Sequence, residues 1–257
     1  MDLNGKIALV TGGAHGIGLA TVNQLLKNGI KGVSICDIAA DLGEQAVESI
    51  NKEYGKGRAI FIKTDVTKQS DLEEAFKKTK QHFGGIDIVV NNAGIIKDSQ
   101  WELMININVN GVVRGTELAV KYMDKNKGGH GGAVVNLASV AGLGLKSASP
   151  AYDGSKYFVV GYTRSMGSPP LDQSHGVRFL CMCPGLTDTP IADGVIEHYE
   201  IHHVSRNLIL DKFAMQQPDN VAQGIIHMLK EGATASVWVS DRSRPVYEVQ
   251  LPDVVKN

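Results

Sequence analysis

Two side chains four positions apart, Tyr152 and Lys156, form the pair in this sequence that is best suited to acid–base chemistry. A free phenol titrates near ~10 and is a poor base at neutral pH. Residues four apart lie on one face of a helix, so the Lys156 ammonium is expected close to the Tyr152 ring, where it favours the ionised phenol. A shift of about three pKa units requires roughly 4 kcal/mol, which one ammonium at ~4 Å supplies at an effective dielectric of about 20. The spacing therefore predicts a tyrosine that exchanges protons.

A glycine-rich loop near the N-terminus predicts a site for a dinucleotide. Residues 11–18 read TGGAHGIG and follow an apolar run directly. Because glycine has no Cβ, such a loop lets a pyrophosphate approach bare backbone at the start of a helix. The contacts expected from this loop are made by Gly12, Gly16, Ile17 and Gly18.

An acidic residue after the second apolar run predicts the kind of dinucleotide. The Asp37 carboxylate is placed to accept hydrogen bonds from the adenosine ribose hydroxyls, and it would repel a 2′-phosphate. Ile38 and Ala39 stand where a cation for that phosphate would be needed, and His15 in the loop is mostly neutral at pH 7. We therefore expect NAD rather than NADP as the cofactor.

Two later turns are expected beside the same cofactor. Asp65 and Val66 follow the third apolar run, where they would meet the adenine edge, and residues 91–94 (NNAG) end the fourth. The expected contacts are Asp65, Val66, Asn92, Ala93 and Gly94. Plain turn chemistry is the alternative interpretation of these residues.

Apolar runs of strand length alternate with amphipathic stretches of helix length, which is typical of a parallel sheet covered by helices on both faces. The expected strands are 6–11, 32–37, 58–63, 86–90, 133–138, 177–182 and 236–239. The expected helices are 16–28, 41–54, 69–83, 100–125, 150–168 and 219–230. The pattern predicts one α/β domain over residues 1–257, built on a doubly wound parallel sheet of about seven strands.

The composition is that of a globular protein and excludes several classes of partner. With 257 residues and 43% hydrophobic content, the chain can bury a large core. Lys and Arg total 26 against 27 acids, so neither nucleic acid nor an anionic membrane is an expected partner. The three cysteines form neither a disulfide framework nor a zinc spacing. We find no leader-like or membrane-spanning pattern, and we expect a cytoplasmic protein without a metal site.

As a set, these residues resemble the classical short-chain dehydrogenase/reductase family. The shared motifs are TGxxxGxG at 11–18, NNAG at 91–94, Ser139 and YxxxK at 152–156, so the resemblance covers nearly the whole chain. It implies a Rossmann-like domain in which Tyr152 exchanges the proton of the substrate hydroxyl and Ser139 holds the substrate oxygen. It implies further that Lys156 binds the nicotinamide ribose and lowers the pKa of Tyr152.

The resemblance also implies roles for residues outside these motifs. An asparagine in the long middle helix carries a water that links the lysine to solvent, and Asn108 best matches it, with Asn106 and Asn110 as alternatives. Four residues after the sixth strand are implied to lie against the nicotinamide or the phosphates: Pro184, Gly185, Thr187 and Thr189. A homodimer or homotetramer formed through helices 100–125 and 150–168 is implied as well.

Within the family the chain is similar to NAD-dependent 15-hydroxyprostaglandin dehydrogenases and to insect-type alcohol dehydrogenases. The prostaglandin enzymes usually carry a substrate-contacting Gln three residues before the tyrosine, and Ser149 stands here instead, which argues against prostaglandin specificity. The expected substrate contacts are Ser139, Ser149 and Tyr152.

Residues 189–213 have an irregular pattern and are expected to form a lid over the substrate. The alternative for about half of their apolar side chains is packing on the core. His198, His202 and His203 in this segment are expected to face solvent, because no carboxylate or cysteine motif completes a metal site.

The predicted reaction is oxidation of a secondary alcohol to a ketone by hydride transfer to NAD, with Tyr152 as the base and Ser139 stabilising the carbonyl oxygen. An apolar steroid, terpenoid, fatty or short-chain alcohol would suit such a pocket. Two alternatives remain open, an NADPH-dependent carbonyl reductase and a dinucleotide-binding protein without catalytic activity.

Overall fold

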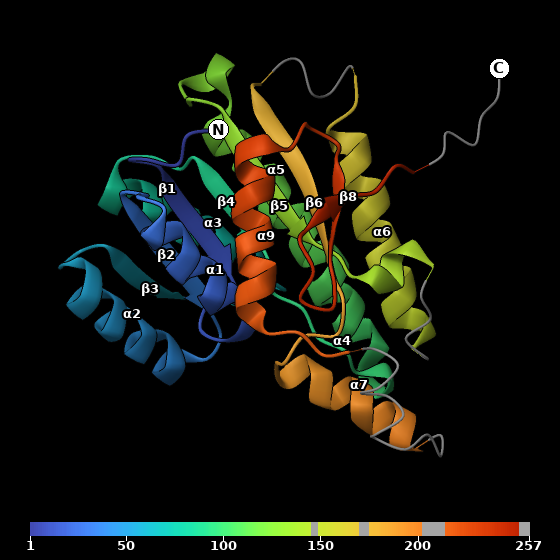
Figure 1. Cartoon of the computed structure of the whole chain (residues 1–257). Helices are drawn as coiled ribbons and strands as arrows, with labels where there is room; N and C mark the ends of the chain where they lie inside the picture. The colour runs from blue at the N-terminus through green and yellow to red at the C-terminus, as the bar shows by residue number, and fades with distance from the viewer. Residues whose placement is uncertain (145–148, 170–174, 202–213, 252–257) are drawn as a thin grey trace.

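The strands lie in the order β3-β2-β1-β4-β5-β6-β7-β8 in one sheet (Figure 1). The computed structural model describes residues 1–144, 149–169, 175–201 and 214–251. In this described part, seven strands are parallel, and β8 pairs antiparallel with β7. The strands are β1 Ile7–Thr11, β2 Gly32–Asp37, β3 Ala59–Lys63, β4 Ile88–Asn91, β5 Gly132–Leu137, β6 Val177–Pro184, β7 Val237–Ser240 and β8 Tyr247–Glu248. The predicted doubly wound parallel sheet is confirmed, and the two-residue β8 is an addition to it.

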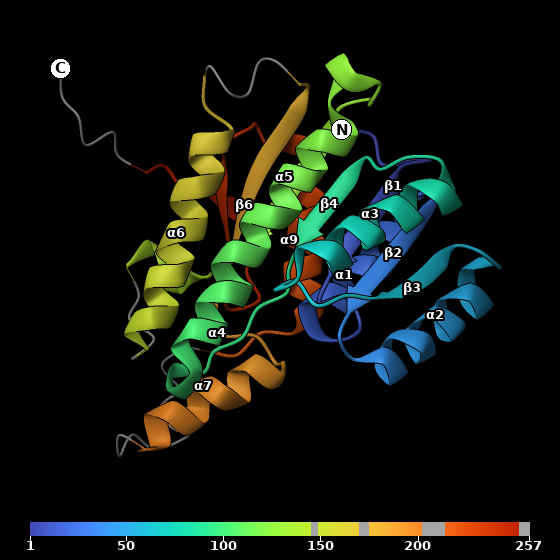
Figure 2. The ribbon, with the colours of Figure 1, turned by 180° about the vertical axis from the view of Figure 1, so that it is seen from behind.

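Helices cover both faces of the sheet, as the alternating pattern predicts. Figure 1 shows α1 (Gly16–Lys27), α2 (Ala40–Tyr54) and α9 (Pro218–Glu231) on one face. Figure 2 shows α3 (Gln69–Phe83), α4 (Trp101–Ile105), α5 (Val112–Met123) and α6 (Pro150–Met166) on the other. Each face has its own apolar core, with Leu25 and Ile225 on the first and Phe76 and Leu118 on the second. Because both faces are covered, β1 is buried along its whole length.

The middle helix differs from the single helix expected over 100–125. A short 3₁₀ turn, η1 (Asp98–Gln100), precedes α4, and a π-helix, η2 (Asn106–Gly111), separates α4 from α5. The apolar spacing of 3.6 residues continues through this region, so the pattern gives no sign of the wider turn. The π-helix contains Asn108, whose side chain bonds to the backbone of Ile95 instead of facing solvent.

Part of the segment expected to be irregular is helical. Helix α7 (Pro190–Ile201) begins at a proline, which suits the first position of a helix, and lies beside α4 in both views (Figures 1 and 2). Ile196 is fully buried, whereas Ile191 is 36% exposed. Residues 202–213 of the expected lid, with His202 and His203, lie outside the described residues, as does the side chain of His198.

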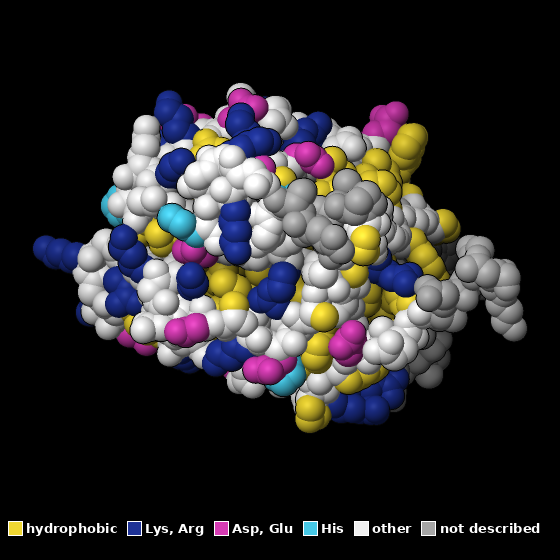
Figure 3. Space-filling view, turned by 90° about the horizontal axis from the view of Figure 1, so that it is seen from above, with side chains coloured by type: hydrophobic (Ala, Val, Ile, Leu, Met, Phe, Trp, Pro, Cys, Tyr) yellow, Lys and Arg dark blue, Asp and Glu magenta, His cyan; other side chains and the backbone are white. Residues whose placement is uncertain are grey.

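The surface carries charges of both signs. Figure 3 shows basic and acidic side chains interspersed on the face seen from above. Among the described helices, none has the length and apolarity needed to cross a bilayer.

Candidate active site

The predicted site residues gather at the carboxyl ends of the parallel strands, where open α/β sheets bind ligands. A pocket of about 420 Å³ lies there and is walled by the loops that follow β1, β2, β3 and β4, together with the start of α7. Ten of the residues expected to bind the cofactor line it: Gly12, Gly16, Ile17, Asp37, Asp65, Val66, Asn92, Ala93, Gly94 and Thr189.

The glycine loop forms one wall of the pocket through close backbone contacts. Gly12 has a φ of +62°, and a Cβ there would lie 2.9 Å from the Ala93 Cα. A Cβ on Gly18 would lie 2.0 Å from the Gly12 carbonyl oxygen, so glycine is needed for α1 to pack beneath the loop. Gly18 does not line the pocket itself. The bare backbone left by these glycines fits a pyrophosphate.

The Asp37 carboxylate is fixed at the pocket by its own neighbours. Its two oxygens each accept one backbone hydrogen bond, from the Ala14 N–H and from the Ala39 N–H, both at 3.0 Å. A carboxylate has about four lone-pair sites, so acceptor capacity remains for a ligand. The group is therefore oriented before any ribose hydroxyl arrives.

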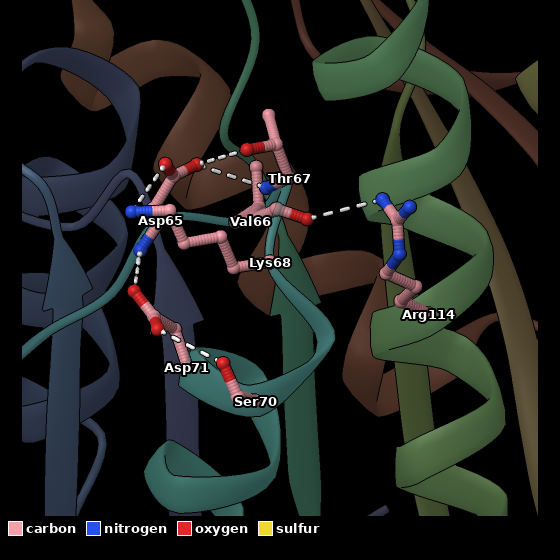
Figure 4. Close-up of polar contacts among 7 residues, drawn as sticks. All are labelled: Asp65, Val66, Thr67, Lys68, Ser70, Asp71 and Arg114. Atoms are coloured by element: carbon pink, nitrogen blue, oxygen red, sulfur yellow. Dashed lines mark hydrogen bonds and ion pairs between the residues drawn. The ribbon is translucent and has the colours of Figure 1, made fainter.

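The turn after β3 holds Asp65 in place (Figure 4). Its Oδ1 accepts hydrogen bonds from the Thr67 N–H and hydroxyl, and its Oδ2 lies 3.6 Å from the Lys68 Nζ. Burial raises the pKa of Asp65, but the Thr67 hydrogen bonds and the Lys68 charge outweigh it, and the net pKa is lowered. The neighbouring Val66 carbonyl accepts from the Arg114 guanidinium at 3.4 Å. The Asp65 carboxylate thus stabilises its own turn, which sets the wall of the pocket.

Asn92 ties the NNAG turn to the glycine loop. Its side-chain amide donates to the carbonyls of Thr11 and Gly12, at 3.0 and 2.9 Å. The Thr11 hydroxyl in turn accepts from the backbone N–H groups of Asn92 and Ala93. These bonds lock the ends of β1 and β4 together at the middle of the pocket.

Ser139, Tyr152 and Lys156 lie together, as their spacing predicts. Ser139 precedes the 3₁₀ turn η4 (Val140–Leu143), and its hydroxyl hydrogen-bonds with the Tyr152 phenol. The Lys156 Nζ lies 5.5 Å from the centroid of the Tyr152 ring. These three side chains come together because α6, which carries Tyr152 and Lys156, packs directly against η4 and β6.

Burial sets the pKa values of this cluster. It raises the pKa of Tyr152 to about 12, although the hydrogen bond with Ser139 acts in the opposite direction. Burial also lowers the pKa of Lys156 to about 8. Burial therefore opposes the expected lowering of the Tyr152 pKa, because a desolvated site disfavours both charged forms. The lowering by Lys156 stays a prediction for the protein with its cofactor bound.

Gly94 connects the cluster to the pocket. A Cβ on Gly94 would lie 3.3 Å from the Asn108 Oδ1 and 3.6 Å from the Lys156 Nζ. The Lys156 ammonium donates to the Leu137 carbonyl at 3.0 Å, which holds it at the end of β5. The lysine thus lies directly behind a residue that walls the pocket.

Of the three asparagines considered in the middle helix, Asn108 is the fully buried one. It donates to the Ile95 carbonyl at 2.9 Å and to the Ser155 hydroxyl at 3.2 Å. Asn110 is exposed and bonds to Asn106, which also accepts from Arg114. The geometry therefore singles out Asn108 as the asparagine beside Lys156.

Several expected contacts lie beside the pocket without lining it. The Thr187 hydroxyl donates to the Gly185 carbonyl and accepts from Gln216, so it stabilises the turn after β6. The Pro184 carbonyl accepts from Ser139 at 3.5 Å. Ser149 is fully buried, and its hydroxyl donates to the Asp98 carboxylate. Contact of these residues with a cofactor or substrate stays a prediction.

Nine further residues line the pocket: His15, Ile38, Thr64, Ile95, Ile96, Lys97, Ile107, Pro190 and Ile191. Pro190 and Ile191 belong to the segment expected as a lid, whereas Thr64, Ile95, Ile96, Lys97 and Ile107 were missed by motif reasoning. Ile95 to Lys97 follow the NNAG motif directly, and this adjacency was a signal that could have found them. Within the described residues, no group of three or more His, Cys, Asp or Glu side chains is placed to hold a metal ion.

Comparisons with known proteins agree with this geometry. The family model described as short chain dehydrogenase matches residues 6–200. The chain is 34% identical to mouse (Mus musculus) 15-hydroxyprostaglandin dehydrogenase [NAD(+)], over 91% of this chain and 88% of the relative. It is 33% identical to alcohol dehydrogenase 1 of Ceratitis capitata, over 96% of this chain and 100% of the relative.

Solved structures show the same fold. The crystal structure of levodione reductase superposes with a TM-score of 0.80 at 24% identity, covering 93% of this chain and 97% of that one. The motifs lie where this architecture requires them, and both the family model and the relatives extend over most of the sequence. The chain therefore belongs to the short-chain dehydrogenase family.

Proposed function

We propose that this protein oxidises a secondary alcohol to a ketone with NAD. The observation that carries the proposal is the cluster of Ser139, Tyr152 and Lys156, in which Tyr152 and Lys156 are buried and the Lys156 ammonium lies behind Gly94, a residue that lines the pocket. The two relatives named above are called dehydrogenases of a hydroxyl-bearing prostaglandin and of alcohols, which agrees with this class of reaction.

The chain's own residues have separate parts in the reaction. The Tyr152 phenolate accepts the proton of the substrate hydroxyl, and Ser139, already hydrogen-bonded to Tyr152, orients the substrate oxygen. Lys156 stabilises the phenolate and would hold the nicotinamide ribose. When bound, the oxidised dinucleotide supplies the hydride acceptor and a positive ring charge that favours the phenolate. Burial raises the pKa of Tyr152 in the protein alone, so the proposal assigns this ring charge a part in forming the phenolate.

Asn108 completes the polar path behind the lysine. Its side chain is fixed by Ile95 and Ser155, and it lies within reach of the same Gly94 position as the Lys156 ammonium. We assign it the part of positioning a water that exchanges protons with Lys156. Asn108→Ala would then slow turnover and change its pH profile without removing the Tyr152–Ser139 pair.

Asp37 supports the choice of NAD. Its fixed carboxylate suits ribose hydroxyls, and a 2′-phosphate at ~4 to 8 Å would meet about 2 to 4 kcal/mol of repulsion at an effective dielectric near ~20. The prostaglandin relatives carry NAD(+) in their names. We therefore expect at least about a tenfold preference for NAD over NADP.

An oligomer, a homodimer or homotetramer, is part of the proposal. Trp101 and Leu103 on α4 and Tyr157 and Phe158 on α6 are between 41% and 56% exposed. In Figure 3, hydrophobic side chains gather on the side of the molecule where α6 lies. A soluble chain with such a face is expected to cover it with a second copy. Light scattering of the native protein tests this, and a monomeric mass would overturn it.

The experiment for the proposed function is a panel of secondary and primary alcohols assayed with NAD and with NADP. We expect NADH formation with apolar secondary alcohols, and much weaker turnover with NADP. A higher rate of ketone reduction with NADPH would identify a carbonyl reductase instead. NADH binding without turnover of any alcohol would support the non-catalytic alternative.

A further inference from the structure

The pocket has a substrate end that is apolar along its sides. Ile95 and Ile96 line the pocket and also pack against the buried cluster that contains Tyr152. Ile191 on α7 faces the same space, and Gly194 of α7 has Ile96 as its nearest neighbour. An apolar chain attached to a carbinol carbon at Tyr152 would lie along these isoleucines.

A basic residue, Lys97, follows these isoleucines in the chain and also lines the pocket. Its backbone N–H donates to the Met104 sulfur at 3.5 Å. Its side chain is exposed, and its ammonium makes no ion pair or hydrogen bond with any residue of the described part of the chain. The ammonium is therefore available to a ligand.

Within the described residues, none of the acids near the pocket forms an ion pair with Lys97. Asp37 and Asp65 lie at the ends of β2 and β3, where backbone N–H groups, Thr67 and Lys68 engage them. The Asp98 carboxylate, next in the chain to Lys97, accepts the Ser149 hydroxyl at the start of α6. The pocket has one other lining residue with a basic side chain among the described residues. This residue is His15, on the glycine loop.

We propose that Lys97 binds the carboxylate of the substrate, which makes the substrate a hydroxy acid whose secondary hydroxyl and carboxylate are separated by an apolar segment. The inference rests on the proposed function and specifies its substrate class. The hydroxyl lies at Tyr152 and Ser139, the apolar segment lies along Ile95 and Ile96, and the carboxylate meets the Lys97 ammonium. The carboxylate takes no part in the hydride and proton transfers.

The test compares hydroxy fatty acids of increasing length, hydroxylated at the carbon before the terminal methyl, with their methyl esters and with unsubstituted 2-alkanols. The readout is the ratio of kcat/KM for each acid to that for its ester, measured with NAD. The wild type is expected to prefer the acid, and Lys97→Met is expected to reduce this ratio about fivefold, as an ion pair of about 1 kcal/mol would. Lys97→Arg is expected to keep the preference, and Lys97→Glu to reverse it.

Two controls make the result specific. Lys56→Met removes a charge from an exposed lysine that does not line the pocket, and it is expected to leave the ratio unchanged. Raising the salt concentration should lower the ratio in the wild type more than in Lys97→Met, because salt screens an exposed ion pair.

The outcomes separate this inference from the proposed function. If the wild type oxidises 2-alkanols and esters as well as the acids, or if Lys97→Met keeps the acid preference, the carboxylate site is wrong and the dehydrogenase remains. If Lys97→Met weakens NADH binding instead of changing the ratio, Lys97 serves the dinucleotide and the inference is overturned. If no alcohol, ester or acid is oxidised with NAD, the proposed function fails and the inference fails with it.

Discussion

The two ends of the pocket differ in whether backbone or side chains form their walls. At the dinucleotide end, the walls are backbone, held by hydrogen bonds such as those from Asn92 to the glycine loop and from Ala14 to Asp37. At the end where we propose that the substrate binds, the pocket is lined by Ile95, Ile96, Lys97 and Ile191. The backbone of the first end is determined by a few residues, namely the glycines and the side chains that hydrogen-bond to the loop. The second end changes with any substitution, so one fold can serve many alcohols.

Tyr152 belongs to the buried cluster against which Ile95 and Ile96 pack, and the neighbouring Lys156 lies behind Gly94, so replacement of Tyr152 tests whether the two ends of the pocket are separable. Tyr152→Phe keeps the ring but removes the hydroxyl that Ser139 contacts. We expect turnover to fall about a thousandfold or more, as loss of a general base does, while the affinity for NADH stays close to the wild-type value. Steady-state rates and NADH titration measure the two effects. Tyr247→Phe, on the exposed strand β8, is the matched control and should change neither.

Gly18 tests the backbone-built end. Gly18→Ala would place a methyl group 2.0 Å from the Gly12 carbonyl, and we expect a loss of about 3 kcal/mol in stability together with weaker NADH binding. Gly161→Ala, also within a helix, meets nothing within 4 Å and should stabilise the protein by about 0.5 to 1 kcal/mol. Urea unfolding of the two variants checks this contrast. Equal effects would mean that the loop is not closely packed.

Replacement of Lys156 tests whether the region behind Gly94 is desolvated. Its pKa is lowered by burial from 10.5 to about 8, so between these pH values the unfolded chain binds more protons than the folded one. Stability of the wild type should therefore rise with pH across this window, by up to about 3 kcal/mol. Lys156→Met should lack this rise in urea unfolding. If the free energies of unfolding of the wild type and of Lys156→Met differed by the same amount from pH 8 to 10.5, the lysine would not be desolvated.

Asp37 and Asp65 line the same end but should differ in effect. Asp37→Asn removes the charge that we propose faces the ribose, and we expect the preference for NAD over NADP to fall about tenfold. Asp65→Asn, whose carboxylate is engaged by Thr67 and Lys68, should change this preference much less. The ratio of kcat/KM for the two cofactors is the measurement. If the cofactor preference changed more in Asp65→Asn than in Asp37→Asn, the charge that discriminates between NAD and NADP would lie after β3 and not at the end of β2.

The sequence predicts the backbone-built parts well. Strands, helices and the neighbourhood of Tyr152 and Lys156 follow from local patterns, because glycine positions and helical spacing determine them directly. The order of the strands in the sheet and the contact of Lys156 with the Leu137 carbonyl depend on packing between distant segments, and no local pattern predicts them.

Other features depend on tertiary context that no local pattern contains. The π-helix contains Asn108, whose side chain bonds to Ile95 and Ser155, residues that are distant in the sequence. The raised pKa of Tyr152 comes from burial by the surrounding elements, whereas the spacing of Tyr152 and Lys156 indicates only their proximity. Helix α7 was missed because its apolar residues divide between a core position, Ile196, and the pocket, Ile191.

The ionisation of Tyr152 is the central claim, and tyrosinate absorbance measures it. Spectra of the wild type minus those of Tyr152→Phe are recorded across pH, with and without saturating NAD. We predict a pKa of about 12 without the dinucleotide and a pKa below that of a free phenol, ~10, with it. A Tyr152 pKa that stays at about 12 in the presence of NAD would contradict its role as the base.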